Sequence, residues 1–401
     1  MEVLDIYMKF LKRYRIVYMV VLFIHGSCNI NKWDLPDKSN ESIPSYAISI
    51  SQFPCIDEFK TSIFAEDDSR YITCIETPTG KIQMIRIQQD FDNEQWTANT
   101  SLLLEWEGKD LKGIVEFEEQ YVVLYKKPQG IQTLALIDKF TLKKDFTQFN
   151  EFIDTSYNKV NATNFHALTV QTQNKEILLF GEVSSQGTSY SAVLAFDMNL
   201  NPIWIKTYLK NAVALDITCA ENDSFLLIQK YKNELNLILD DSKSNDYRKY
   251  VLAIDTSFVN LEMYQKNENV YLLSTNIIKQ ISSLFTLHLT NKSAFVEDVK
   301  AYPVTIISGI LDGDQVICSG IIDSLGKTPK AFVTNVRFGS SDWCNIFDNA
   351  NFERPLSVLK AKGKGYLFFY IAKQGNQYFP FIVRTDAEGA TFDNAFNFNC
   401  L

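Results

Sequence analysis

Short apolar segments recur along the chain at nearly constant intervals. Each is rich in the branched and aromatic residues of buried β-strands, and polar turns separate it from the next such segment. The seven segments are Arg70–Ile75, Tyr121–Tyr125, Ile177–Phe180, Phe225–Ile228, Val270–Ser274, Gln315–Ser319 and Tyr366–Tyr370. Equivalent residues in them, from Tyr71 to Tyr366, are 50, 56, 48, 45, 45 and 51 residues apart. This period indicates a chain built from repeated units rather than from unrelated domains.

The unit at residues 165–208 shows the order of its elements most clearly. Its four candidate strands are Phe165–Gln171, Glu176–Val183, Ser189–Asp197 and Pro202–Tyr208. A sheet of four short antiparallel strands is too small to be stable alone, but a radial arrangement covers both faces of each sheet with its neighbours. We therefore predict an all-β fold, a β-propeller of seven four-stranded blades, with six blades as the alternative.

The same order of strands predicts which segments lie at the centre and which at the rim. We expect Phe165–Gln171 and Val213–Thr218 to line the central channel, and the segments near Trp204 and Trp343 to lie outermost. Closure of the ring is left open by the sequence, because Tyr46–Ser51 and Thr391–Phe398 are both candidates for the outer strand of the last blade.

The unit also contains a characteristic set of residues: Gly181, Asp197, Asn201, Trp204, Lys206 and Tyr208. This pattern resembles a repeat of exported bacterial propellers, in which a glycine lies in the second strand and Asp, a tight turn and Trp-x-Lys-x-Tyr follow. The Asp is expected to accept backbone N–H groups of the turn, and the tryptophan to cover the next blade.

Residues 1–27 have the three parts of an export signal. A basic cluster, Lys9–Arg15, precedes the apolar run Ile16–Ile24, which is too short to span a bilayer, and Gly26-Ser27 leads into Cys28. Small residues directly before a cysteine resemble the lipobox of bacterial lipoproteins, which implies lipidation at Cys28, although His25 replaces the usual aliphatic residue. Plain secretion or a short membrane anchor is the alternative. Residues 28–44 are predicted to be a flexible tether, and residues 45–401 a single propeller domain.

Charge and cysteine content exclude several classes of protein. The net charge is −9, and since residues 1–27 carry four basic and two acidic side chains, the remainder is at −11. The sequence has no basic stripe, so no nucleic-acid partner is expected. Cysteines at 55, 74, 219, 318, 344 and 400 never stand at C-x-x-C spacing, so they are either buried thiols or disulfides of undetermined pairing.

The sequence contains little that resembles catalytic machinery. Outside the signal the only histidines are His166 and His288, both in strand patterns where a packed side chain is expected. No nucleophile elbow, zinc-protease, P-loop or dinucleotide motif occurs, and no metal or cofactor is predicted. The acidic stretches Glu116–Glu119 and Asp312–Asp314 are interpreted as solvated turns. Asp240–Asp246 has the carboxylates to chelate calcium, but its spacing does not match the EF-hand loop. Carboxylates from distant blades that meet in the channel remain possible.

The connections between blades and the hairpins that join second to third strands are expected to share one face. Trp106, Lys127, Tyr157, Tyr302 and Arg354 fall in or next to these segments and are the candidate binding residues. We therefore expect a lipid-anchored, non-catalytic binding protein of the bacterial cell envelope, periplasmic or surface-exposed, with a protein or glycan ligand. The alternative is a carbohydrate-active enzyme, a glycoside hydrolase or lyase, that uses carboxylates in the central funnel.

Overall fold

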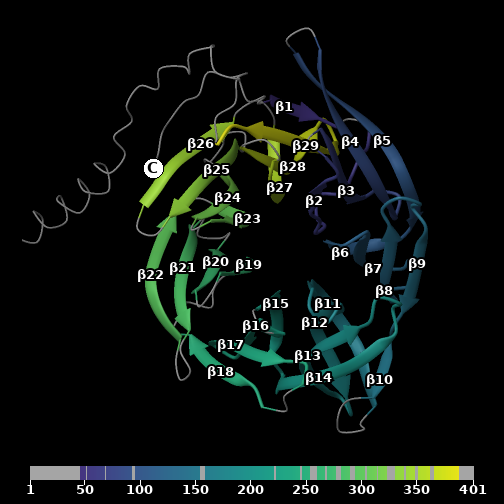
Figure 1. Ribbon diagram of the computed structural model, residues 1–401, viewed down its shortest axis with the longest axis vertical. Coiled ribbons are helices and arrows are strands. Elements are labelled where there is room, and N and C mark those ends of the chain that lie inside the picture. The colour runs from purple at the N-terminus through teal and green to yellow at the C-terminus, as the bar shows by residue number, and fades with distance from the viewer. Residues whose placement is uncertain are drawn as a thin grey trace, which may run out of the picture. The chain divides into compact units, whose positions relative to one another are not determined.

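The structure is a computed structural model of the chain, and it contains β-strands and no helix over the residues it describes. These are residues 46–387, apart from short breaks at 51, 68, 93–94, 154–158, 221–222, 244–245, 253–259, 267–268, 277–280, 290–293, 303–304, 314, 323–329, 338–339, 348–350 and 362–364. The strands form seven separate antiparallel sheets, which follow one another around a ring (Figure 1). The fold is a seven-bladed β-propeller, as the sequence predicts.

Each blade is defined by its strands. Blade 1 contains β2 (Ile63–Ala65), β3 (Arg70–Glu76), β4 (Lys81–Asp92) and β5 (Gln95–Glu107). Blade 2 contains β6 (Lys109–Phe117), β7 (Gln120–Lys126), β8 (Gln132–Asp138) and β9 (Lys144–Gln148). Blade 3 contains β11 (Lys159–Gln171), β12 (Glu176–Ser185), β13 (Thr188–Phe196) and β14 (Pro202–Lys210), with β10 (Glu151–Ile153) as a short fifth strand beside β11.

The remaining blades repeat this pattern. Blade 4 contains β15 (Val213–Cys219), β16 (Ser224–Tyr231), β17 (Glu234–Asp241) and β18 (Arg248–Leu252). Blade 5 contains β19 (Asn260–Lys266), β20 (Asn269–Asn276), β21 (Ile281–Leu289) and β22 (Ala294–Tyr302). Blade 6 contains β23 (Thr305–Asp312), β24 (Gln315–Ile322), β25 (Lys330–Arg337) and β26 (Ser340–Phe347). Blade 7 contains β27 (Asn351–Lys360), β28 (Tyr366–Gln374), β29 (Gln377–Thr385) and β1 (Tyr46–Ser49).

The first strand of each blade lies nearest the centre of the ring. From β6 onward each of these strands contacts its counterpart in the next blade, and β27 contacts β2. The predicted strand order is therefore confirmed: Phe165–Gln171 and Val213–Thr218 fall in the innermost strands β11 and β15, while Trp204 and Trp343 fall in the outermost strands β14 and β26. Residues 95–107, which follow the third strand of blade 1, form β5 and pair with β4 rather than making a long connection.

Blade 7 takes its outermost strand from the beginning of the chain. Tyr46 pairs with Arg384, and Ser49 with Phe381, in antiparallel register. The buried Arg384 guanidinium donates to the Tyr71 hydroxyl at 2.8 Å, which ties blade 7 to blade 1. One of the two predicted closures is thus confirmed, and it covers an edge of β29 that would otherwise be open to pairing with other chains. The other candidate, Thr391–Phe398, lies outside the described residues.

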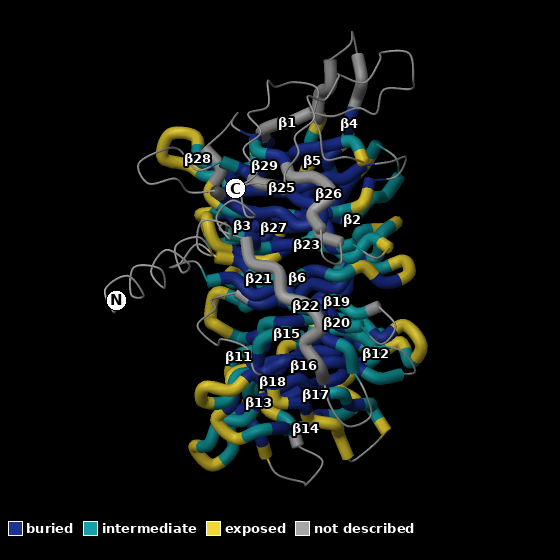
Figure 2. The backbone as a smooth tube through the Cα atoms, turned by 90° about the vertical axis from the view of Figure 1, so that its left-hand side faces the viewer, coloured by how far each residue is buried: buried dark blue, intermediate teal, exposed yellow. Residues whose placement is uncertain are grey.

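The core consists mainly of the second and third strands of the blades (Figure 2). Ile72, Val123, Leu227 and Phe369 are each fully buried on such strands. These strands have apolar residues on both sides because both faces of a blade are covered by its neighbours, which explains why the sequence shows continuous apolar runs rather than alternation.

The glycine of the repeat permits a close approach between two strands. A Cβ atom on Gly181 would lie 2.2 Å from the Asn164 carbonyl oxygen, and one on Gly320 would lie 2.3 Å from that of Thr305. In both blades the glycine faces an irregular register in the innermost strand, next to residues 165 and 306. A bulge pushes the inner backbone outward here, so only glycine fits opposite it.

Other residues of the repeat shape a turn and a contact between blades. The Asp197 carboxylate accepts the backbone N–H groups of Asn199 and Asn201 at 2.9 and 2.8 Å, as predicted. Lys206 and Tyr208 both bond Asp240 of blade 4, the hydroxyl at 2.7 Å. Asp240 is therefore a buried acceptor that joins blades 3 and 4. Among the described residues, no cluster of three or more His, Cys, Asp or Glu side chains could hold a metal ion.

The cysteines that the structure describes form no disulfide bond with one another. Cys55, Cys74, Cys219 and Cys318 are all unpaired thiols, and all but Cys219 are fully buried. Cys28, the export signal and the tether lie outside the described residues. Over residues 46–387 as described, no helix of the length and apolar character needed to cross a membrane is present.

Candidate functional site

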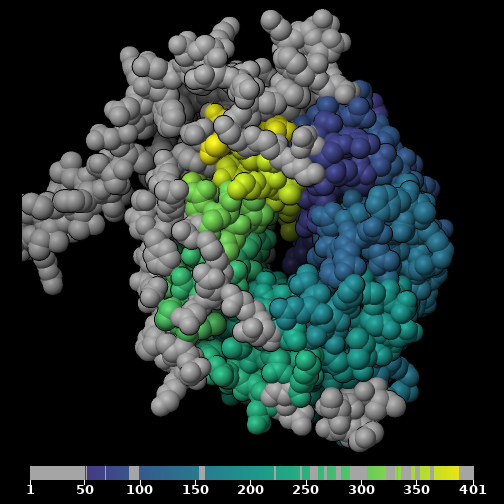
Figure 3. All heavy atoms as spheres, in the orientation of Figure 1, coloured from purple at the N-terminus to yellow at the C-terminus, as the bar shows by residue number. Residues whose placement is uncertain are grey.

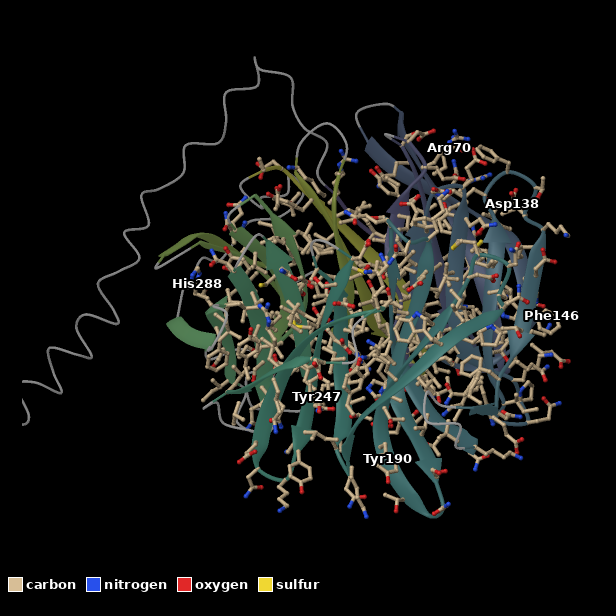
Figure 4. All side chains as sticks on the ribbon, turned by 60° about the horizontal axis from the view of Figure 1, so that its bottom comes forward. Arg70, Asp138, Phe146, Tyr190, Tyr247 and His288 are labelled. Carbon is tan, nitrogen blue, oxygen red and sulfur yellow. The ribbon has the colours of Figure 1, made fainter. Side chains whose placement is uncertain are left out.

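One face of the ring carries the connections between blades and the hairpins that join second to third strands. On this face, a pocket of about 410 Å³ lies between the outer parts of blades 1 and 2, and we call it the Trp106 pocket. Its lining residues are Trp106, Glu107, Tyr125, Lys127, Pro128, Gln129, Ile131, Lys144, Phe146 and Gln148. Lys144, Phe146 and Gln148 alternate along β9 and so present one face of the strand to the pocket. Figure 4 shows Phe146 at the outer margin of the ring.

Trp106 is held at the end of β5 by packing against blade 2. Its ring meets Tyr125 edge-on, with centroids 6.1 Å apart, and only 8% of the residue is exposed. The following Gly108 permits this approach, because a Cβ there would lie 2.7 Å from the Tyr125 ring. The indole Nε1 is buried and has no hydrogen-bond acceptor among the described residues. Such a donor has lost its hydrogen bonds to water without gaining one to the protein, and most buried donors in folded proteins do have an acceptor.

Two ammonium groups lie over the aromatic rings of the pocket. Lys127 Nζ is 4.2 Å from the centre of the Phe146 ring, and Lys144 Nζ is 4.9 Å from that of Trp106. Neither lysine forms an ion pair with a described residue. Burial, and secondly the nearby charge of Lys127, lowers the pKa of Lys144.

Four other lysines of blade 2 do have acidic partners. Lys112 and Lys126 both contact Asp110, Lys139 contacts Glu116, and Lys143 contacts Asp145 at 3.2 Å. The Trp106 pocket therefore gathers two ammonium groups that have no ion-pair partner among the described residues, and Glu107 is the acidic residue in its lining.

The structure brings together two of the five predicted binding residues. Trp106 and Lys127 line the same pocket. Arg354 lies instead on the innermost strand β27, where its guanidinium is 3.9 Å from Glu58. Tyr302 ends β22 at the rim of blade 5, and Tyr157 lies outside the described residues.

Sequence reasoning missed Phe146 and Lys144. Their signal was the alternation of Lys144, Phe146 and Gln148, which marks one face of a strand that also includes an exposed aromatic residue. Phe146 is 50% exposed, so half of its surface is available for contact.

A second group of candidate residues lies toward the channel, whose opening is visible at the centre of Figure 3. Asp216 on β15 and Glu262 on β19 are carboxylates of adjacent innermost strands. Burial raises the pKa of Asp216 to about 6 and that of Glu262 to about 7. The charge of Lys60 opposes both shifts. A carboxyl group with a raised pKa is the kind of group that enzymes use as a general acid.

Both carboxylates are nevertheless engaged in joining the blades. Asp216 accepts the backbone N–H of Met263 at 2.9 Å, and Glu262 accepts that of Gly309 at 3.2 Å and also the Tyr264 hydroxyl. Glu76 and Glu182 accept backbone N–H groups of the following blade in the same manner. These bonds form a repeated set of contacts between blades, so they explain the buried carboxylates without catalysis.

The two histidines have the packed positions expected of them. His166 Nε2 lies 2.9 Å from the Ala214 carbonyl oxygen of the next blade, and burial lowers the pKa of this imidazole to about 4. His288 Nδ1 lies 3.1 Å from the Asn269 side-chain oxygen. Neither arrangement contains a nucleophile beside a base, so the described residues offer no triad.

Comparisons of the sequence with protein families and with curated proteins gave no match. Among solved structures, a functionally unknown protein from Desulfotomaculum acetoxidans has a TM-score of 0.51 at 10% identity, over 81% of this chain and 98% of that one. The polysaccharide lyase Uly1 has a TM-score of 0.50 at 8% identity, over 83% and 91% of the two chains. A phage phi92 endosialidase has a TM-score of 0.45 at 9% identity, over 89% and 71%. At such identities the likeness concerns the fold alone.

Proposed function

We propose that the chain is a non-catalytic binding protein, held on the bacterial cell envelope by a lipid at Cys28. The observation that carries the binding role is the Trp106 pocket, where Trp106 and Lys127 from different blades meet Lys144 and Phe146. Rigid aromatic side chains with nearby cations are the groups that dominate binding surfaces. The Gly26-Ser27-Cys28 sequence after an apolar run supports the lipid anchor.

A second candidate function is cleavage of a carbohydrate in the channel. The observation in its favour is the raised pKa of Asp216 and of Glu262 on neighbouring innermost strands. We rank it second because each carboxylate already accepts a backbone N–H from the next blade. A carboxylate that is held by such a hydrogen bond between blades is less free to exchange protons with a substrate.

One experiment separates the two functions. The full-length protein is incubated with a panel of polysaccharides, and both binding, by affinity electrophoresis, and product release, by new reducing ends and unsaturated sugars, are measured. The binding protein retards at least one polysaccharide and releases no product. Product release that Asp216→Asn or Glu262→Gln abolishes would establish the enzyme instead.

A further inference from the structure

We propose that the Trp106 pocket binds an acidic sugar residue of a polysaccharide, with the sugar carboxylate or sulfate between Lys127 and Lys144. This proposal rests on the binding function above and names its ligand class. It is carried by three independent features of the pocket: its two lysines without ion-pair partners among the described residues, its aromatic surface and its unpaired buried donor.

The two ammonium groups of the pocket favour an anionic ligand. Lys127 and Lys144 have no acidic partner among the described residues, whereas the neighbouring Lys143 is paired with Asp145. The rings of Phe146 and Trp106 hold the two ammonium groups in place, at 4.2 and 4.9 Å from their centres. The positions of the two cations are thereby fixed before a ligand arrives, so less entropy is lost when an anion binds.

The surface around these charges suits a sugar ring. A volume of about 410 Å³ lies in the lower part of the range of small-ligand sites. Phe146, half exposed, offers an apolar surface to the C–H groups of a sugar, and Gln129, Gln148 and Glu107 offer amide and carboxylate groups to its hydroxyls. The buried Trp106 Nε1 is one further donor that a ligand oxygen would satisfy after a small shift of the ring.

The position of the pocket on its strand favours a sugar over an acidic peptide. Peptides that bind sheets add a strand to a free hydrogen-bonding edge. Here the pocket is lined by alternate side chains of β9, at Lys144, Phe146 and Gln148, so it opens on the face of the strand. An extended peptide in this place would leave its backbone groups without partners.

The negative net charge of the protein limits its attraction for an anionic sugar to the surroundings of the two lysines. At a net charge of −9 the whole molecule repels polyanions, whereas the two lysines of the Trp106 pocket attract them locally. Binding should therefore weaken as salt is added, because the two lysines are near enough to the surface to be screened.

The test is calorimetric titration of the full-length protein with acidic oligosaccharides. The probes are oligogalacturonate, alginate and chondroitin sulfate oligosaccharides and sialyllactose, each with its carboxyl-reduced or desulfated form, together with a tetraglutamate peptide. We expect at least one acidic sugar to bind, and its neutral form to bind at least about ten-fold more weakly, as for loss of a charged hydrogen bond. Lys127→Gln and Lys144→Gln should each reduce affinity by a similar factor, with an unchanged thermal midpoint. Lys143→Gln, whose side chain is exposed and paired, is the matched control and should bind as the wild type does.

The other outcomes of the titration contradict different parts of the proposal. Failure of every acidic sugar to bind, or tighter binding of tetraglutamate, overturns the sugar assignment. If the affinity for the acidic sugar is unchanged in both lysine variants, the ligand binds elsewhere. The assignment to the Trp106 pocket is then wrong, while the proposed binding function stands. Cleavage of a bound sugar overturns the non-catalytic function, and a lysine-dependent affinity would still support the pocket.

Discussion

The indole of Trp204 lies parallel to the ring of Phe225, with ring centroids 6.0 Å apart and planes inclined by 17°. The first residue belongs to the outermost strand of blade 3 and the second to β16 of blade 4, so this stack joins two blades. The Trp204 Nε1 also donates to Glu176 at 3.3 Å. The tryptophan of the repeat therefore covers the next blade, as the sequence predicts.

Replacement of this tryptophan should destabilise the propeller. Trp204→Ala removes the stack and its hydrogen bond, and because Trp204 is partly exposed we expect a loss near the lower end of the about 3–5 kcal/mol typical of large aromatic truncations. Chemical denaturation followed by intrinsic fluorescence measures the change. The adjacent Ile203→Ala, at a side chain that is 49% exposed, is the control and should cost far less. Equal losses for the two variants would refute the importance of the stack.

The close approach at Gly181 predicts a large effect from a single methyl group. In Gly181→Ala the new Cβ would meet the Asn164 oxygen and the Phe165 Cα, at 2.2 and 2.4 Å, so the inner strand must move. We expect destabilisation of at least about 2 kcal/mol, as for overpacking of a core. In Gly113→Ala the nearest atom would be 3.8 Å away, and this control should be close to neutral. The difference between the two thermal midpoints is the measurement.

The half-buried Glu262 should make stability depend on pH. Its folded-state pKa, raised to about 7, exceeds the usual value of 4.5, so its contribution is fully present below about 4.5 and is lost as the pH rises through 7. Asp216 raises this pKa, while the Tyr264 hydroxyl and the charge of Lys60 lower it. Glu262→Gln keeps an acceptor for Gly309 and removes the titration. The stability of the variant relative to the wild type should therefore improve between pH 4 and pH 8, as urea denaturation would show. A difference that is constant with pH contradicts the raised pKa.

The strand from the beginning of the chain should be essential for the ring. Deletion of residues 45–50 removes β1 and exposes the edge of β29, and we expect a lower thermal midpoint together with aggregation detectable by light scattering. Deletion of residues 29–44, the predicted tether, should leave the midpoint unchanged. A closed and equally stable ring without β1 would require another strand in its place.

Lipidation is a prediction that rests on the sequence alone. Cells fed a fatty-acid analogue should label the wild-type protein, and Cys28→Ala should abolish the label, because the predicted acyl chain would be attached to this thiol. Cys55→Ala, at a buried thiol of the propeller, is the matched control and should be labelled as the wild type is. Continued labelling of Cys28→Ala would disprove the anchor.

The sequence predicts the strands well and the site only in part. Period and apolar runs locate the second strands, because Phe225–Ile228 or Tyr366–Tyr370 must be buried on both faces whatever surrounds them. Pairing between blades depends on contacts far apart in sequence, so the bonds of Asp216 to Met263 and Glu262 to Gly309 are invisible until the ring is formed. Lys144 and Phe146 were missed for the same reason, since the other side of their pocket is supplied by Trp106 of the preceding blade.

The pairing of β1 with β29 also determines the order in which the molecule can assemble. Tyr46 and its partner Arg384 are separated by 384 − 46 = 338 residues, whereas β2–β5, and each later group up to β26, are contiguous in the chain. Sheets of neighbouring strands form quickly, but contacts of such separation are slow to form because a long loop must close first. Blades 1 to 6 can therefore take shape as the chain emerges, and blade 7 must wait until β29 has been synthesised. Until β29 is present, the edge on which β1 pairs does not exist, so closure of the ring must be the last step of assembly.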